Sequence, residues 1–294
     1  MLSANHVAFC RGGTSASLVA LLLIVLLIPL LFRRPNAYLE LSEEQKNLTL
    51  AKKTKQEVEW WTYSDCFRPL PNPILGEKKN DDDSLATKII NVGFPKTGTT
   101  TLHQFLESSP ILNSSHWRCG TLFCANCIQS SISRGLPPLA TCGNFAAYIQ
   151  MDFIDFFNTK NMSSCIFPQI SYLKEIYEEA PTAIFILPFR NVTDWMRSTT
   201  RWRDMRRRMA EFCEFPEYNF TRGMANQDHE MENLYCRHVR RIRRFVAEHP
   251  RLTLLEYSIN DDGVGDYLSS MIPQFHLNGS KYGHENRNSE KIPG

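Results

Sequence analysis

The chain has 294 residues, of which 22% are charged, and its formal net charge at pH 7 is only +2. These values are ordinary for a globular protein, and so small a net charge argues against binding to nucleic acid. The length allows one globular domain together with a membrane anchor and a stem.

A membrane anchor is predicted near the N-terminus. Residues 14–32 are uncharged and mostly aliphatic, and they lie between Arg11 and the pair Arg33-Arg34. As a helix they would span about 28 Å, which is enough to cross a bilayer once. A cleaved signal peptide or a buried core helix is the alternative, but no small-x-small cleavage site comes after the run. We therefore predict a short cytoplasmic tail at 1–13, a transmembrane signal anchor at 14–32, a lumenal stem at 33–85 and a globular domain at 86–294.

The orientation of this anchor is predicted from the residues on its C-terminal side. Flanking positive charge is nearly balanced and slightly favours a cytoplasmic C-terminal side. Against this, six glycosylation sequons and eight of the nine cysteines lie after the anchor, as expected in an oxidising lumen. We predict a single-pass type II protein of the Golgi membrane. The sequons begin at Asn47, Asn113, Asn161, Asn191, Asn219 and Asn278.

The segment 89–106 has the pattern of a phosphate-binding loop. Residues 89–94 form an apolar run typical of a buried strand, and Leu102, Phe105 and Leu106 lie on one face of a subsequent helix. Strand, tight turn and helix N-terminus direct unpaired backbone N–H groups to one point, where an anion binds. Lys96 adds a positive charge. Hydroxyl donors come from Thr97, Thr99, Thr100 and Thr101.

The spacing in this loop argues against a nucleoside triphosphatase. In that class a lysine comes directly after the second glycine of GxxxxGK[ST], and the next hydroxyl binds magnesium. Here Lys96 precedes Gly98, and Thr99 occupies the position of the lysine. Hydrolysis of ATP or GTP is therefore not expected, and no carboxylate cluster for a metal is evident in the sequence.

A second apolar run, residues 183–189, ends in Arg190, and Ser198 comes eight residues later. An arginine offers a bidentate fork to a phosphate, and a serine adds one hydroxyl from the next helix. These two motifs, in this order, closely resemble those of the P-loop sulfotransferase superfamily, including its membrane-anchored Golgi members. The resemblance extends from about residue 88 to residue 286. Its members transfer a sulfuryl group from 3′-phosphoadenosine 5′-phosphosulfate (PAPS).

The resemblance implies roles for particular residues. The loop would hold the 5′-phosphosulfate of PAPS through Pro95, Lys96, Thr97, Gly98, Thr99, Thr100 and Thr101. Lys96 would neutralise the bridging oxygen of the leaving nucleotide, and Arg190 and Ser198 would bind the 3′-phosphate. The short C-terminal element with Tyr282, Gly283 and His284 resembles a tail that covers the donor, although it is equally consistent with a plain polar tail. A metal is not implied.

A general base is expected, because the acceptor hydroxyl or amine must lose a proton. Asp152, just after the segment 148–151, lies where related enzymes carry their base and is our first choice. His116, near the end of the predicted second strand, and His103, in the first helix, are alternatives. Asp152 could instead cap a helix, so the sequence leaves this assignment open.

Four cysteines, Cys119, Cys124, Cys127 and Cys142, are close together in the sequence. Their spacing allows a zinc site, but the first gap and the predicted lumenal setting favour disulfides, whose pairing the sequence does not give. The surrounding segment, 121–144, has few periodic apolar residues, and we predict a cysteine-stapled insertion after the second strand that shapes the acceptor pocket.

The remaining pattern predicts an α/β domain with three layers, α/β/α, around a mainly parallel P-loop-type sheet. We expect an amphipathic helix at 167–180, a long arginine-rich helix after Arg190 that reaches residue 208, and a second basic helix at 234–249. A strand at 252–257 and a last helix ending near residue 271 complete the domain. Some of these arginines are expected to bind the anionic donor. The others either attract an acidic glycan acceptor or form only a solvated basic face.

Three functions compete for these motifs. The first is a PAPS-dependent sulfotransferase that acts on a hydroxyl or amine acceptor, in the first instance a glycan. The second is a P-loop small-molecule kinase, against which the absence of a lysine after Gly98 argues. The third is a non-catalytic, membrane-anchored nucleotide-binding protein with the same fold. The presence of Lys96, Arg190 and Ser198 together favours the enzyme.

Overall fold

The computed structural model describes residues 62–77, 87–154 and 165–283. All three ranges fall within one structural unit. The predicted membrane span at 14–32 lies outside these ranges, and no helix inside them is long and apolar enough to cross a membrane.

A seven-stranded sheet lies at the centre of the described fold, in the order β4-β3-β2-β5-β1-β8-β9. Five neighbouring strands of this sheet pair in parallel. They are β2 (Ser114–His116), β5 (Ala147–Gln150), β1 (Ile89–Asn91), β8 (Ile184–Phe189) and β9 (Thr253–Ser258). The antiparallel strands β3 (Arg118–Cys119) and β4 (Leu122–Phe123) form one edge. A separate antiparallel pair joins β6 (Phe153–Ile154) to β7 (Cys165–Ile166).

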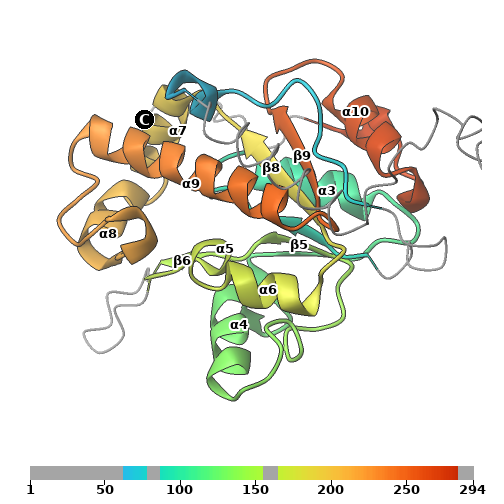
Figure 1. The fold of residues 1–294 in the computed structure, drawn as a ribbon, viewed down its shortest axis with the longest axis horizontal. Helices are drawn as coiled ribbons and strands as arrows, with labels where there is room; N and C mark the ends of the chain where they lie inside the picture. The colour runs from blue at the N-terminus through green and yellow to red at the C-terminus, as the bar shows by residue number, and fades with distance from the viewer. Residues whose placement is uncertain (1–61, 78–86, 155–164, 284–294) are drawn as a thin grey trace, which may run out of the picture. The chain divides into compact units, whose positions relative to one another are not determined.

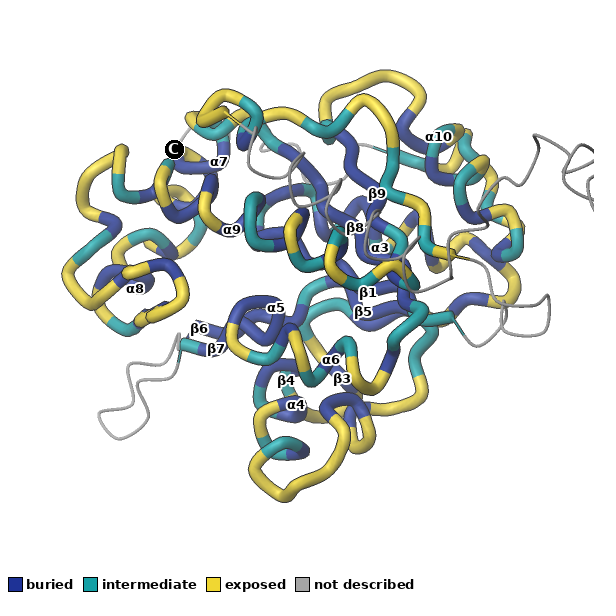
Figure 2. The backbone as a smooth tube through the Cα atoms, viewed as in Figure 1, coloured by how far each residue is buried: buried dark blue, intermediate teal, exposed yellow. Residues whose placement is uncertain are grey.

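Helices cover both faces of this sheet. Successive side chains of a strand point to opposite faces, so each strand contributes residues to the packing on both sides. Phe185 and Leu187 of β8 pack in a cluster with α9 (Asp228–Glu248), whereas Ile184 and Ile186 pack with α3 (Thr99–Glu107) and α10 (Val264–Met271). Figure 1 shows α9 and α10 on opposite sides of β8 and β9. In Figure 2 these strands form the dark, buried centre. The predicted α/β class with a mainly parallel sheet is confirmed.

Two predicted long helices are interrupted in the structure. The amphipathic helix at 167–180 is divided at Tyr172 into α5 (Pro168–Ser171) and α6 (Leu173–Glu179). The arginine-rich helix after Arg190 is divided into α7 (Val192–Arg201) and α8 (Met205–Phe212). Between them Arg203 and Asp204 have φ values of 48°, in the left-handed region that no helix propagates through. The prediction of one continuous helix was wrong, because the tertiary contacts of Trp202 outweigh local helix propensity.

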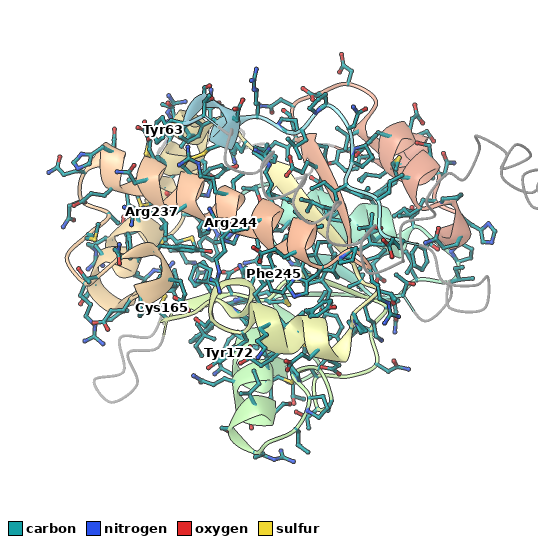
Figure 3. All side chains as sticks on the ribbon, in the orientation of Figure 1. Tyr63, Cys165, Tyr172, Arg237, Arg244 and Phe245 are labelled. Atoms are coloured by element: carbon teal, nitrogen blue, oxygen red, sulfur yellow. A yellow bond between two sulfur atoms is a disulfide. The ribbon has the colours of Figure 1, made fainter. Side chains whose placement is uncertain are left out.

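The second basic helix starts earlier than predicted. Helix α9 begins at Asp228 rather than at residue 234, because Gln227 and Glu230 form a capping box. Figure 3 shows Arg237 and Arg244 along this helix and Tyr63 beside it. Short 3-10 turns complete the described chain. They are η1 (Ser64–Phe67), η3 (Pro216–Tyr218), η4 (Pro273–Phe275) and η5 (Gly279–Lys281).

The cysteine-rich segment after β2 is more regular than predicted. Helix α4 (Cys124–Ser133) lies within it and was not predicted, whereas the expected stapling by cysteines is present. The zinc alternative is not adopted, because the four cysteines pair as disulfides Cys119–Cys124 and Cys127–Cys142. Disulfide bonds here replace the periodic apolar face that normally marks a helix in a sequence.

Part of the predicted stem packs on the domain. Cys66 in η1 forms a disulfide with Cys236 of α9. Further along, Ile74 exchanges two backbone hydrogen bonds with Leu254 of β9, with N···O distances of 3.1 and 2.7 Å. The segment 62–77 is thus attached both covalently and by hydrogen bonds.

Candidate active site

The predicted phosphate loop joins β1 to α3, as the sequence pattern indicated. Lys96 and Gly98 have φ values of 71° and 83°, and such left-handed residues turn successive N–H groups toward one side. A Cβ atom at Gly98 would lie 3.1 Å from Cγ2 of Ile259, so both backbone and space favour glycine. The first intrahelical bond runs from Leu102 to Gly98, which leaves the preceding N–H groups of α3 without intrahelical partners. This is an anion-binding arrangement.

The second motif contacts this loop directly. Because β1 and β8 are parallel neighbours, the residues just after them lie at the same edge of the sheet. Nη1 of Arg190 donates to the carbonyl oxygen of Lys96 at 3.0 Å, and Nε1 of Trp195 donates to that of Pro95 at 3.0 Å. Ser198 is buried one turn further along α7, and its hydroxyl makes no hydrogen bond to another described residue. The structure therefore brings Lys96, Arg190 and Ser198 into one region.

The threonine hydroxyls of the loop differ in the groups that they contact. Thr97 is fully buried and its hydroxyl donates to the carbonyl of Phe94 at 2.6 Å, while that of Thr99 donates to Gln150 at 3.0 Å. These two hydroxyls are engaged within the protein, so Thr97 and Thr99 offer an anion their backbone N–H groups. Thr100 is half-buried, and its hydroxyl has no hydrogen-bond partner among the described residues. Thr101 is buried in the same turn.

Asp152 lies just after β5, and its side chain is buried. Burial raises the pKa of its carboxyl group to about 7, although its own backbone N–H, Gln150, Arg208 and Lys96 oppose the rise. A carboxylate that titrates near neutral pH is suited to general-base chemistry.

Two cations surround Trp202 in the same region. Nζ of Lys96 lies 5.1 Å from the centre of the indole ring, and the guanidinium of Arg208 lies 5.7 Å from it. Burial lowers the pKa of Lys96, and nearby Arg190 lowers it further, whereas Asp152 has the opposite effect. Burial also lowers the pKa of Arg208 to about 10, so Arg208 remains protonated at neutral pH.

The alternative bases, His116 and His103, stack with ring centres 5.2 Å apart. Burial lowers the pKa of His116 to about 4, and the neighbouring His103 and Lys96 lower it too. Burial likewise lowers the pKa of His103, which is hydrogen-bonded to Ser114. Both imidazoles are therefore neutral at pH 7. Of the three candidates, Asp152 is the one whose pKa burial brings toward neutral pH from below.

The tail element packs against α3 and β9. The ring of Tyr282 packs edge-on to Phe105 and Tyr257, at 5.4 and 6.1 Å between centres. Gly283 is the last described residue, and His284 lies outside the described ranges. The donor-covering role of Tyr282, Gly283 and His284 stays a prediction.

Much of the arginine charge is used within the protein. Arg237 and Arg241 donate to carbonyl groups of Tyr218 and Ile170, and Arg206 pairs with Asp228. These arginines therefore act largely as hydrogen-bond donors that stabilise the fold. In the described part of the chain, no group of His, Cys, Asp and Glu has the arrangement of a metal site.

Three residues of this region were not predicted from the sequence: Trp195, Gln150 and Arg208. Trp195 lies inside the Arg190–Ser198 motif, and Gln150 is a polar residue at the carboxyl end of a buried strand, so both had a local signal. Arg208 was counted only as one arginine of the predicted basic helix, because its position beside Asp152 depends on the break before α8.

A family model described as a sulfotransferase domain matches residues 88–267, which is more than half of the chain. This chain belongs to the sulfotransferase family. No curated protein and no solved structure gives a match. The matched range of this sulfotransferase includes the loop, Asp152 and the Arg190–Ser198 motif, and it ends before Tyr282.

Proposed function

We propose that this sulfotransferase uses PAPS as its donor and transfers the sulfuryl group to a hydroxyl group of a glycan acceptor. The observation that carries the proposal is the 3.0 Å hydrogen bond from Arg190 to the carbonyl of Lys96. It joins two anion-binding motifs that are about 90 residues apart in the sequence, as a donor with phosphates at two positions requires.

The residues at this site fit such a donor. The left-handed turn and the N-terminus of α3 supply N–H groups for the 5′-phosphosulfate, with Lys96 beside them. Arg190 is half-buried, and the hydroxyl of Ser198, which has no hydrogen-bond partner among the described residues, suits the 3′-phosphate. When bound, PAPS supplies an activated sulfuryl group.

The protein's own side chains then position the reacting groups and neutralise the charge that develops. Asp152 accepts the proton of the acceptor hydroxyl as the oxygen forms its bond to sulfur, and the bond from sulfur to the nucleotide phosphate breaks. Lys96 stabilises the negative charge that develops on the leaving phosphate oxygen. Alignment of acceptor and donor provides much of the remaining rate acceleration, as in phosphoryl transfer.

The proposed setting is the Golgi lumen, with a type II anchor at 14–32. Four disulfides support an oxidising compartment: Cys66–Cys236, Cys119–Cys124, Cys127–Cys142 and Cys165–Cys213. The glycan acceptor is proposed because such acceptors are abundant there.

Calorimetric binding of 3′-phosphoadenosine 5′-phosphate to the purified domain tests the donor. Binding without metal is expected for the wild type and for Lys174→Ala, whose lysine is exposed on α6, and strong loss is expected for Lys96→Ala and Arg190→Ala. Binding of ATP with magnesium in place of this nucleotide would instead support the kinase. Retention of donor binding without turnover on any acceptor would support the non-catalytic alternative.

A further inference from the structure

A chain of polar side chains connects the phosphate loop to Asp152. The hydroxyl of Thr99, the first residue of α3, donates to Oε1 of Gln150 at 3.0 Å. Nε2 of Gln150 in turn donates to Oδ2 of Asp152, in a longer contact of 3.5 Å. An amide has an acceptor at one end and donors at the other, so these two contacts define the orientation of Gln150.

His116 completes this chain at its far end. Its Nε2 lies 3.2 Å from Oγ1 of Thr99. The single hydroxyl hydrogen of Thr99 is already directed at Gln150, so Nε2 of His116 must carry the hydrogen of the pair. His116 is thus a donor at this atom, which agrees with a neutral imidazole that is not the general base.

From this geometry we propose that Gln150 and Thr99 are positioning residues, which together connect the donor loop to the general base Asp152. The inference rests on the proposed function, because it assumes that Asp152 accepts the acceptor proton. Thr99 offers its N–H group to the donor phosphate and its hydroxyl to Gln150, so a single residue belongs to both sides of the reaction. Gln150 engages Oδ2 of Asp152 and leaves Oδ1 for the acceptor hydroxyl.

The contact of the Gln150 side-chain amide with Asp152 shifts the pKa of Asp152 in a defined direction. An N–H group that donates to a carboxylate favours the ionised form, so removal of Gln150 raises the pKa of Asp152. The charged groups that face Asp152 in the described structure are Lys96 of the loop and Arg208 of α8, and both also favour ionisation. They remain in a Gln150 variant. The expected shift is therefore moderate and upward.

The test compares Gln150→Met and Thr99→Val with the wild type, with Thr99→Ser as the conservative variant and Gln104→Met as the control. Gln104 is exposed on the same helix as Thr99. Because the base works when ionised, Gln150→Met should lower kcat about three- to tenfold at pH 6 and change it less than about twofold at pH 9. Binding of 3′-phosphoadenosine 5′-phosphate by Gln150→Met should stay within about twofold of the wild type. Thr99→Val should shift the profile in the same direction, and Thr99→Ser should restore it.

A second readout does not depend on turnover. The carboxyl carbon of Asp152, followed by NMR through a pH titration, should show a higher midpoint in Gln150→Met than in the wild type and Gln104→Met. An unchanged midpoint, or an equal loss of kcat at all pH values, would overturn the inference. A raised midpoint in a protein that binds no donor nucleotide would leave the contact intact and reject the proposed function.

Discussion

Two regions of this molecule bury charged groups, and they treat the charges differently. Arg243 of α9 and Glu256 of β9 form an ion pair whose side chains are 1% and 2% exposed. Two hydrogen bonds of 2.7 and 2.8 Å join them, and further bonds run from Arg243 to the carbonyls of Asp65 and Arg68. The backbone N–H of Leu70 donates to Glu256 at 2.7 Å.

At the carboxyl ends of β1 and β5, by contrast, Asp152 interacts with Lys96 and Arg208 electrostatically. The hydrogen bond that its carboxylate accepts from the side-chain amide of Gln150 is long, at 3.5 Å. The paired charges of the first region hold three chain segments together, whereas those of the second region retain perturbed pKa values. Complete pairing therefore serves stability, and incomplete pairing keeps a group able to exchange a proton.

The strongest effect on folding should come from breaking the complete pair. Arg243→Met leaves Glu256 buried without its partner and should lower the free energy of unfolding by about 3–5 kcal/mol, measured by urea denaturation. Arg197→Met is the matched control, because Arg197 pairs with Asp194 in an exposed position and should cost less than about 1 kcal/mol. Equal losses in the two variants would contradict the comparison. The double variant Arg243→Met/Glu256→Leu should lose less than Arg243→Met.

Asp152→Asn should have opposite effects on turnover and stability. Loss of the proposed general base should reduce kcat by about 10²–10⁴-fold in a sulfuryl-transfer assay. The folded pKa of Asp152 is raised from 3.8 to about 7, so the native state binds more protons than the unfolded state between these values. The contribution of Asp152 to stability is thus present below pH 4 and is lost as the pH rises through 7.

The asparagine variant does not ionise, and its stability relative to the wild type should therefore increase between pH 5 and pH 8. Thermal unfolding at both pH values measures this. If the variant is less stable than the wild type by the same amount at pH 5 and pH 8, then Asp152 has a structural role, as Arg243 and Glu256 have.

Lys96→Ala should reduce kcat/KM by about 10²–10³-fold, because the charge that we propose stabilises the leaving phosphate is lost. Stability should change little, since burial of Lys96 opposes its charge rather than stabilising the fold. Steady-state kinetics beside thermal unfolding measure both quantities. A variant that is strongly destabilised, but whose folded fraction keeps the specific activity of the wild type, would contradict this prediction.

The cap of α7 should matter least. Oδ1 of Asn191 accepts from the N–H groups of Thr193 and Asp194 at 3.0 and 3.3 Å. Asn191→Ala should cost about 1 kcal/mol of unfolding free energy and weaken donor binding slightly, because α7 carries Ser198. Asn233→Ala, at an exposed position within α9, is the control and should cost nothing.

The strands and the loop between β1 and α3 were predictable because their signals are local. The apolar runs before Lys96 and Arg190, and the spacing of Arg190 and Ser198, are properties of neighbouring residues. Asp152 and His116 were placed near the ends of strands for the same reason, and both lie there.

The missed features depend on contacts that local patterns in the sequence do not specify. The break at Arg203 and Asp204 accompanies the packing of Trp202 between Lys96 and Arg208, which are more than 100 residues apart. Helix α4 is held by cysteine pairs, whose connectivity spacing does not give. The pairing of Arg243 with Glu256 had no sequence signal either, since one is a member of a basic run and the other lies in an apolar strand.

The disulfide between Cys66 and Cys236 has a mechanical consequence. Its closed loop spans 170 residues and contains Lys96, Asp152, Arg190 and Ser198. A pulling force applied to the two ends of the chain would pass from Cys66 to Cys236 through the sulfur atoms. Once the residues outside this loop are extended, the intervening segment carries little of that tension, so the backbone between the two cysteines cannot be drawn out until the disulfide is reduced.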